Sequence, residues 1–219
     1  MSINLSILPI KLQYRNFWEA QILMLLQDAI GFVSGTPQFR ITESGLAAAP
    51  AYVLYSQSDL EEDLSGLVDE GDRDTLDEKR RRIKTADSVV TAAAGDVVFS
   101  LLSGTAALVL PEHGGYLLTQ NYVKLIPPET IDRRYLVYLI NESREIRRQL
   151  RLGQQGSVTM KFTLKQLKTL ELPALAPCER QGRIGELYLS VLRLNALKKR
   201  AAERETTMML GIMREADRS

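Results

Sequence analysis

The sequence predicts an α+β protein in which a small domain, with a curved, mostly antiparallel sheet and helices, precedes one long C-terminal coiled-coil helix. Three observations support this class. Short apolar segments separated by glycine and proline fill residues 97–126, a helical apolar pattern covers residues 130–152, and residues 179–216 contain no proline. Such patterns are typical of tight-turned strands and of helices. We place the domain boundary between residues 1–176 and residues 177–219.

The composition is that of an ordinary globular protein. The 219 residues suit one domain plus an appendage, and 45% hydrophobic and 25% charged residues are usual values. With one cysteine, Cys178, the chain has no internal disulfide, and residues 1–16 lack the pattern of a secretory signal. The early apolar run Ile22 to Leu26 is too short to cross a membrane. We therefore expect a cytoplasmic protein with no membrane partner.

Charge is distributed unevenly along the chain. The net charge is only +1, but residues 59–78 hold ten acidic residues and one arginine, so the rest is basic. A basic excess favours a nucleic-acid partner. We interpret residues 59–78 as a solvated, mobile excursion, since runs of like charge rarely pack. The basic cluster that follows, including Arg80 and Arg81, is either a solvated face or a set of phosphate contacts.

The segments before the acidic stretch suggest a helix, a turn and a strand. The apolar spacing of Phe17 to Phe32 predicts a helix, or a helix that runs into a strand. Gly35 to Pro37 predicts a turn. Gln38 and Arg40 follow it, and amide and guanidinium groups are those that pair with adenine and guanine edges, although surface solvation explains them too. Residues 51–55 read as a strand.

The middle of the chain predicts the sheet. Four strands are expected, at Val97–Ser100, Ala106–Leu110, Tyr116–Leu118 and Tyr122–Ile126. Ser103 and Gln120 lie in the connecting loops, where small polar side chains suit either a groove-reading surface or ordinary turns.

A helix is expected next, from a cap at Thr130 or Asp132 to about Leu152. Four arginines share one face of it: Arg144, Arg147, Arg148 and Arg151. They are either a polyanion contact or a solvated face paired with Glu142 and Glu145. A short helical turn after Thr163 and a strand at Leu170–Leu172 should follow.

The chain ends with a long helical pattern from Glu179 to about Ala216. A helix of that length spans about 55 Å, more than the width of a small domain. Its coiled-coil stripe consists of Ile184, Leu187, Val191 and Leu194. Because such a stripe needs a partner helix, we expect a helix-mediated assembly.

Sequence motifs for catalysis and metal binding are missing. The only histidine, His113, is expected to be a structural turn residue, and Cys178 an inert thiol. The chain has no P-loop, no dinucleotide fingerprint and no Asn/Asp-Pro-Pro-aromatic motif, since Pro127-Pro128-Glu129 lacks the flanking residues. Carboxylates cluster only in the acidic segment, where we expect no metal site.

Three stretches resemble the specificity subunits of type I restriction-modification enzymes. They are LQDAIGFVSGTP at residues 26–37, the segment 95–128 with GDVVFS and LTQN, and GQQGSVTMKFTLKQLKTLELPALAPCERQGRIGEL at residues 153–187. In order and spacing they match one target-recognition domain that runs into a long helix. The family normally carries two of each per chain. The chain therefore resembles a half-length subunit, or a truncated one.

The resemblance implies a protein without catalytic activity or a cofactor of its own. It would read one half of a bipartite target in double-stranded DNA and dock a methyltransferase subunit that uses S-adenosylmethionine and flips the target adenine. Whether a restriction subunit joins stays open. A homodimer through antiparallel C-terminal helices would recognise an inverted repeat.

The resemblance also implies which side chains face DNA. Those expected at base edges are Gln38, Arg40, Ser103, Gln120, Gln154, Gln155 and Ser157. Those expected at phosphates are Arg80, Arg81, Arg147, Arg148 and Lys161. Two other functions stay open: a coiled-coil adaptor that binds protein, and a small hydrolase with a pocket at His113 or Cys178.

Overall fold

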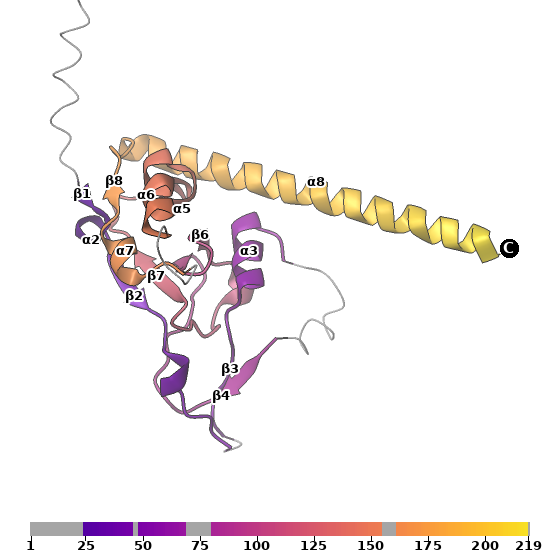
Figure 1. Cartoon of the computed structure of the whole chain (residues 1–219), viewed down its shortest axis with the longest axis horizontal. Helices are drawn as coiled ribbons and strands as arrows, with labels where there is room; N and C mark the ends of the chain where they lie inside the picture. Colours follow the sequence, from indigo (N-terminus) through magenta and orange to yellow (C-terminus); the bar gives the residue numbers. More distant parts are fainter. Residues whose placement is uncertain (1–23, 46–47, 69–79, 155–160, 219) are drawn as a thin grey trace, which may run out of the picture.

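The computed structural model describes residues 24–45, 48–68, 80–154 and 161–218. The described residues before α8 form a head, and one long helix, α8 (Cys178–Arg218), extends away from it (Figure 1). The predicted class is confirmed, because an α+β head with antiparallel sheets precedes a long C-terminal helix.

The central sheet has four antiparallel strands in the order β2-β7-β5-β6. Their bounds are Gly31–Ser34 for β2, Val97–Ser100 for β5, Thr105–Leu108 for β6 and Tyr122–Ile126 for β7. Two antiparallel pairs accompany it: β1 (Met24–Leu25) with β8 (Glu171–Leu172), and β3 (Ala51–Val53) with β4 (Arg82–Lys84). The predicted strands at 97–100 and 122–126 have the observed bounds, whereas segment 116–118 contributes only isolated bridges through Leu117.

Helices cover both faces of the central sheet. On one side, Phe99 shares a buried cluster with Leu136 of α5 (Arg133–Glu142) and Ile146 of α6 (Arg144–Gln154). On the other side, Val98 shares a second cluster with Leu60 of α3 (Gln57–Ser65). All four residues of β5 are therefore buried, which explains why its sequence is an apolar run without alternation.

One helix prediction needs correction. The expected helix from residue 130 to 152 is interrupted at Ser143, whose backbone is extended and whose N–H donates to Leu139 O at 3.1 Å. The hydroxyl of Ser143 then accepts from the N–H of Ile146 at the start of α6. The described part of residues 17–32 agrees with the expectation of a helix that runs into a strand, since the single turn α2 (Leu26–Ala29) is followed by β2, and residues 17–23 lie outside the described residues.

The short elements follow the predicted capping chemistry. Asp132 accepts from the N–H groups of Arg134 and Tyr135 and begins α5. Thr163 and Gln166 form a capping box at α7 (Leu164–Lys168). Two 3₁₀ turns complete the fold: η1 (Gln38–Arg40) and η2 (Pro111–His113).

The first turns of α8 pack directly on α5. Gly185 is buried, and a Cβ built there would lie 2.5 Å from the backbone of Arg134 and Tyr135. Gln181 is also buried; its amide oxygen accepts from Asp132 N–H and its amide nitrogen donates to Ala176 O, both at 2.9 Å. Tyr188 donates to Glu142 Oε1 at 3.0 Å. The head and the helix are therefore joined without a flexible link.

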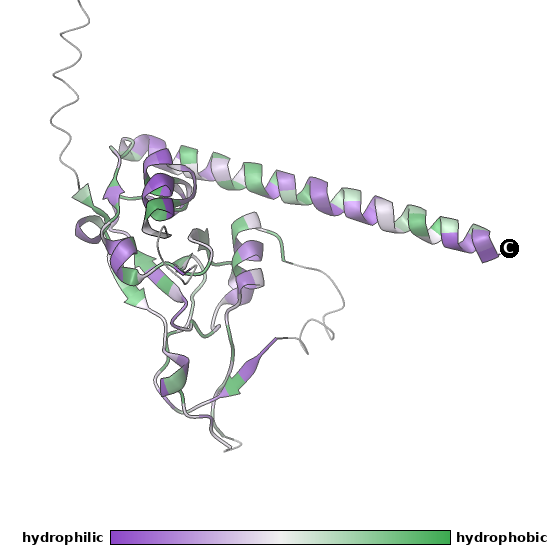
Figure 2. Ribbon diagram, viewed as in Figure 1, coloured by the Kyte–Doolittle hydropathy of each residue, from purple (hydrophilic) through white to green (hydrophobic). Residues whose placement is uncertain are grey.

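Beyond the head, α8 carries an uncovered apolar surface. Figure 2 shows apolar residues recurring along this part of the helix. The exposed large apolar residues are Leu187, Val191, Leu194, Leu197, Met208, Met209, Leu210, Ile212 and Met213. Charged residues are interspersed among them, and no helix in the described ranges has the length and apolar content needed to cross a membrane.

Alanine at two glycines of α8 should have opposite effects. Gly185→Ala forces a methyl group against the α5 backbone and should lower the free energy of unfolding by about 1–3 kcal/mol. Gly211→Ala meets no atom within 4 Å and should leave that free energy unchanged or raise it by up to about 1 kcal/mol. Urea unfolding followed by circular dichroism measures both. Equal effects would contradict the close packing at Gly185.

The cap of α5 should make stability depend on pH. Burial opposes ionisation of Asp132, but hydrogen bonds from Arg134 and Tyr135 outweigh it and hold the pKa of Asp132 below its usual value. Such a group stabilises the fold above its unfolded pKa, and this contribution disappears as pH falls through the folded pKa. Asp132→Asn, which keeps a capping oxygen, should be less stable than wild type near neutral pH. The difference should vanish in acid; a constant difference in urea unfolding across pH would contradict it.

Candidate nucleic-acid interface

The turn η1 is held against the loop that precedes β7. Gly35 makes this possible, because a Cβ there would lie 2.1 Å from Thr119 O. The N–H of Gln38 then donates to Gln120 Oε1 at 2.6 Å. Both glutamines are exposed, so two predicted base contacts, 82 residues apart in sequence, lie side by side.

The turn at residues 101–104 presents Ser103. The buried hydroxyl of Ser100 accepts from the N–H groups of Leu102 and Ser103 at 3.2 and 3.3 Å. Gly104 has a φ of 68° and lies against the Phe162 ring, where a Cβ would come within 2.4 Å of a ring carbon. Ser103 is therefore exposed at the tip of a turn that only glycine can close.

Backbone hydrogen bonds connect these loops to one another. Leu101 N–H donates to Asn121 O, and Phe162 N–H donates to Leu101 O, each at 2.8 Å. Lys161 Nζ lies 3.5 Å from Asn121 Oδ1, and Arg147 donates to Gly104 O at 3.2 Å. We call the resulting surface the polar strip; it consists of Gln38, Gln120, Asn121, Lys161, Ser103 and Arg147.

Other predicted contacts lie beside this strip or outside the described residues. Arg81 is exposed and lines a pocket of about 450 Å³ together with Gln38 and Asn121. Arg40 is exposed on η1, and Arg148 is exposed on α6. Gln154 is the last residue of α6. Gln155 and Ser157 fall outside the described residues.

Sequence reasoning assigned no role to Phe39 or Asn121. Phe39 is 82% exposed on η1, between Gln38 and Arg40. An exposed aromatic ring beside amide and guanidinium groups is suited to stacking on nucleic-acid bases. The sequence places Phe39 two residues after Pro37 in a polar stretch, but its exposure on a three-residue 3₁₀ turn is known only from the structure.

Arg80 differs from the other predicted phosphate contacts. Its guanidinium lies 3.6 Å from Asp59 and 3.9 Å from Glu62, and it also donates to the hydroxyl of Tyr116. Its side chain is 26% exposed. Arg80 therefore neutralises carboxylates of its own head instead of facing outward.

The acidic segment was expected to be a solvated excursion, and for residues 59–65 this is wrong. They belong to α3, which begins with a capping box between Ser56 and Asp59. Asp59 and Asp63 are each 3% exposed, on the side of α3 that faces the sheet. Residues 69–78 of the segment lie outside the described residues.

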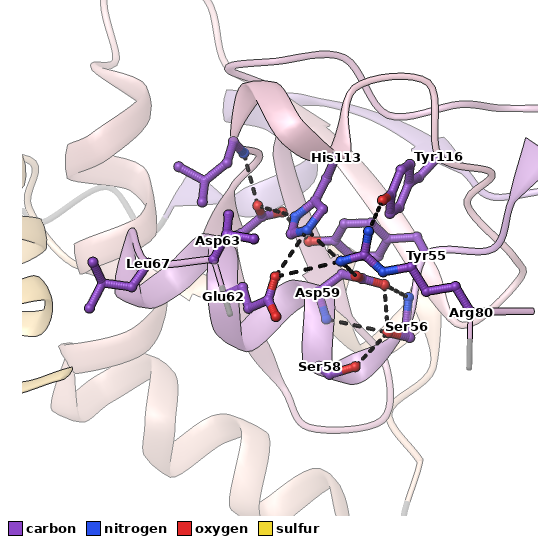
Figure 3. Close-up of polar contacts among 12 residues, drawn as sticks. Tyr55, Ser56, Ser58, Asp59, Glu62, Asp63, Leu67, Arg80, His113 and Tyr116 are labelled. Carbon is purple, nitrogen blue, oxygen red and sulfur yellow. Dashed lines mark hydrogen bonds and ion pairs between the residues drawn. The ribbon is translucent and has the colours of Figure 1, made fainter. Parts of the chain in front are cut away.

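Buried charges under α3 converge on His113 (Figure 3). One oxygen of Asp63 accepts from Leu110 N–H at 2.9 Å and lies 2.7 Å from His113 Nδ1. The other oxygen accepts from Tyr55 Oη at 2.5 Å. Burial and the Asp63 charge raise the pKa of Tyr55, which keeps it a donor.

His113 itself is fully buried, as a structural residue would be. Burial disfavours its charged form, but the Asp63 hydrogen bond and the charges of Asp63, Asp59 and Glu62 outweigh burial and raise the pKa of His113. The His113 cluster, which we define as Asp59, Glu62, Asp63, Arg80 and His113, therefore joins α3, η2 and the segment before β4.

Cys178 lies in a different part of the head from this cluster. It is exposed at the start of α8, and its thiol donates to Thr130 O at 3.4 Å. The pocket of about 420 Å³ beside it is lined by charged residues of α5 and α8, with no histidine among the lining residues. Among the described residues, Cys178 and His113 therefore belong to separate parts of the head and do not form one site.

The fold is similar to two solved structures from type I restriction-modification systems. One is the HsdS subunit of Thermoanaerobacter tengcongensis, with a TM-score of 0.51 and 20% identity over 82% of this chain and 39% of that chain. The other comes from a study of complex assembly and conformational transition of the type I system, with a TM-score of 0.55 and 19% identity over 85% and 42%. No protein-family model and no curated protein matches the sequence.

These similarities show the fold of about half of a type I specificity subunit. The chain spans about 40% of the length of the structures that it matches. One head and one long helix account for that share, and the predicted resemblance is confirmed at the level of fold.

Removing the charge of Asp63 should unfold the head more easily. Asp63→Asn removes the buried negative charge that faces His113 and turns one of the two acceptor oxygens into an amide donor, so it should cost about 3–5 kcal/mol. Glu61→Gln, on the exposed side of the same helix, is the control and should change stability by less than about 0.5 kcal/mol. Urea unfolding gives both values, and a change below about 1 kcal/mol for Asp63→Asn would contradict its anchoring role.

Proposed function

We propose that this protein is a non-catalytic DNA-specificity subunit of a type I restriction-modification system. The observation that carries the proposal is the similarity in fold to one half of such subunits, head and long helix together. In this proposal the head reads one half of a bipartite target. A methyltransferase subunit, which holds S-adenosylmethionine, docks on the same chain.

The chemistry of the polar strip supports a role in reading DNA. Amide groups of Gln38, Gln120 and Asn121 suit adenine edges in the major groove. Lys161, Arg147 and the neighbouring Arg81 place positive charge around these amides, as phosphate contacts require, and Arg148 adds a further exposed guanidinium on α6. Arg80 is left out of this assignment because its guanidinium pairs with a carboxylate of the same head.

The apolar surface of α8 supports pairing with a second copy. Leu187, Val191 and Leu194 are 67%, 47% and 51% exposed. Ile184, the fourth residue of the predicted stripe, packs on the core of its own head and is left out. A two-fold pair of antiparallel helices would place two identical heads at a fixed separation, so that the target becomes an inverted repeat.

The function is tested by expressing the chain with a candidate methyltransferase subunit and mapping methylated adenines across the genome. A split, symmetric motif with a constant spacer is the expected result. Its loss when this chain is deleted assigns recognition to the chain. Methylation that continues unchanged without the chain would overturn the proposal.

A second candidate is a coiled-coil adaptor without DNA contacts. The observation that favours it is the apolar end of α8, where Met208, Met209, Ile212 and Met213 are all exposed. Flexible methionine side chains suit varied protein partners. An adaptor binds no DNA at any salt concentration, whereas a reader binds with an affinity that falls steeply as salt rises.

Removing phosphate contacts should reduce the salt dependence of DNA binding. Arg148→Gln and Lys161→Gln should each lower the slope of log K against log salt by about 1, because each removes one neutralised phosphate. Arg214→Gln, near the far end of α8, keeps the same change of charge away from the strip and should leave the slope as it is. Fluorescence anisotropy across a salt series measures the slope for each variant. Equal slopes in all variants would contradict phosphate contacts at Arg148 and Lys161.

A charge in the apolar stripe should separate the dimer. Leu194→Glu buries a carboxylate in the proposed helix pair and should weaken self-association by at least about ten-fold. Asn195→Glu adds the same charge one position further, off the stripe, and serves as the control. Analytical ultracentrifugation reports the dissociation constants. A wild-type monomer at high concentration would exclude the pairing.

A further inference from the structure

Two atoms in the His113 cluster are buried without a hydrogen bond. His113 Nε2 and Glu62 Oε2 lie 3.2 Å apart, yet neither has a hydrogen-bond partner among the described residues. The His113 side chain is fully buried and Glu62 is 18% exposed. Buried polar atoms are almost always hydrogen-bonded, so this pair indicates that something else binds there.

The orientation of His113 suits a metal ligand. Its Nδ1 lies 2.7 Å from Asp63 Oδ1, and that carboxylate is itself held by Tyr55 and Leu110. With Nδ1 donating its proton to Asp63, Nε2 faces Glu62 and Asp59, and its lone pair becomes available to an ion there once Nε2 has lost its proton. Metal-binding histidines generally use a carboxylate in this way to set ring orientation and tautomer.

The spacing of the donor atoms matches a tetrahedral ion. His113 Nε2 lies 3.2 Å from Glu62 Oε2 and 3.5 Å from Asp59 Oδ1, and the three ligand atoms lie within 4.8 Å of one another. Bonds of about 2.0–2.1 Å in a tetrahedral zinc site separate neighbouring ligands by about 3.3 Å. We propose that Asp59, Glu62 and His113 form a binding site for a divalent transition-metal ion, best suited to Zn²⁺.

Arg80 occupies the open side of this site. Its guanidinium contacts Asp59 and Glu62 at 3.6 and 3.9 Å, and all three residues line the pocket of about 450 Å³ that also contains Gln38 and Arg81. The pocket provides an entry path for the ion. Metal binding displaces Arg80 from the carboxylates. Where the His113 ring is protonated, metal binding also releases its Nε2 proton. The metal site and the polar strip thus share one pocket.

The test uses the full chain after treatment with a chelator, titrated with Zn²⁺ in a calorimeter. Wild type should bind one equivalent. Glu62→Gln, which leaves the Asp63–His113 contact intact, should weaken binding by more than about ten-fold. Glu61→Gln, a neighbouring exposed carboxylate on α3, should bind as wild type does. Arg80→Gln should bind more tightly, because the competing cation is removed.

Cobalt distinguishes a built site from loose surface binding. Co²⁺ in a tetrahedral site absorbs strongly in the visible range, and this band should appear in wild type and Glu61→Gln but not in Glu62→Gln. Circular dichroism checks that every variant is folded. No binding by wild type, or equal binding by wild type and Glu62→Gln, would overturn the proposal. Neither measurement depends on DNA, so the outcome is independent of the proposed function.

Discussion

The close packing of α8 on α5 is the constraint on which the rest of the structure depends. At Gly185 the two helices approach so closely that a methyl group has no space, and Gln181 links the cap of α5 to Ala176. Because these contacts are buried, the direction of α8 is set by the head. The helix has 41 residues and is about 60 Å long, so it extends from the head in a fixed direction. Two heads paired through α8 would therefore have a defined separation.

The polar strip depends on a second set of buried contacts. Its side chains come from five separate parts of the chain, and hydrogen bonds of the backbone and of side chains join these parts to one another. Behind the sheet, Asp63 anchors α3 to Leu110 and His113, and Gln57 of α3 accepts from Ser100 beneath the Ser103 turn. Buried polar contacts therefore hold in place the loops that carry the polar strip.

Elements dictated by local pattern were predictable from sequence. The strands at 97–100 and 122–126, the cap at Asp132 and the long helix all follow from runs of apolar residues and nearby capping groups. The break at Ser143 was not predictable, since the apolar spacing continues through it and the turn is decided by packing of α5 and α6 on the sheet. Burial of Asp59 and Asp63 was missed for a related reason. Their partners, Arg80 and His113, come from other parts of the chain.

The sequence by itself determined the fold class, the order of the main elements and the presence of a free apolar stripe on the last helix. These depend on periodicity and capping, which act over a few residues. Only the tertiary structure decided which polar residues meet: Gln38 with Gln120, Lys161 with Asn121, and Arg80 inside the head. Contacts between residues far apart in sequence depend on how strands pair and helices dock, and no local sequence pattern predicts these arrangements.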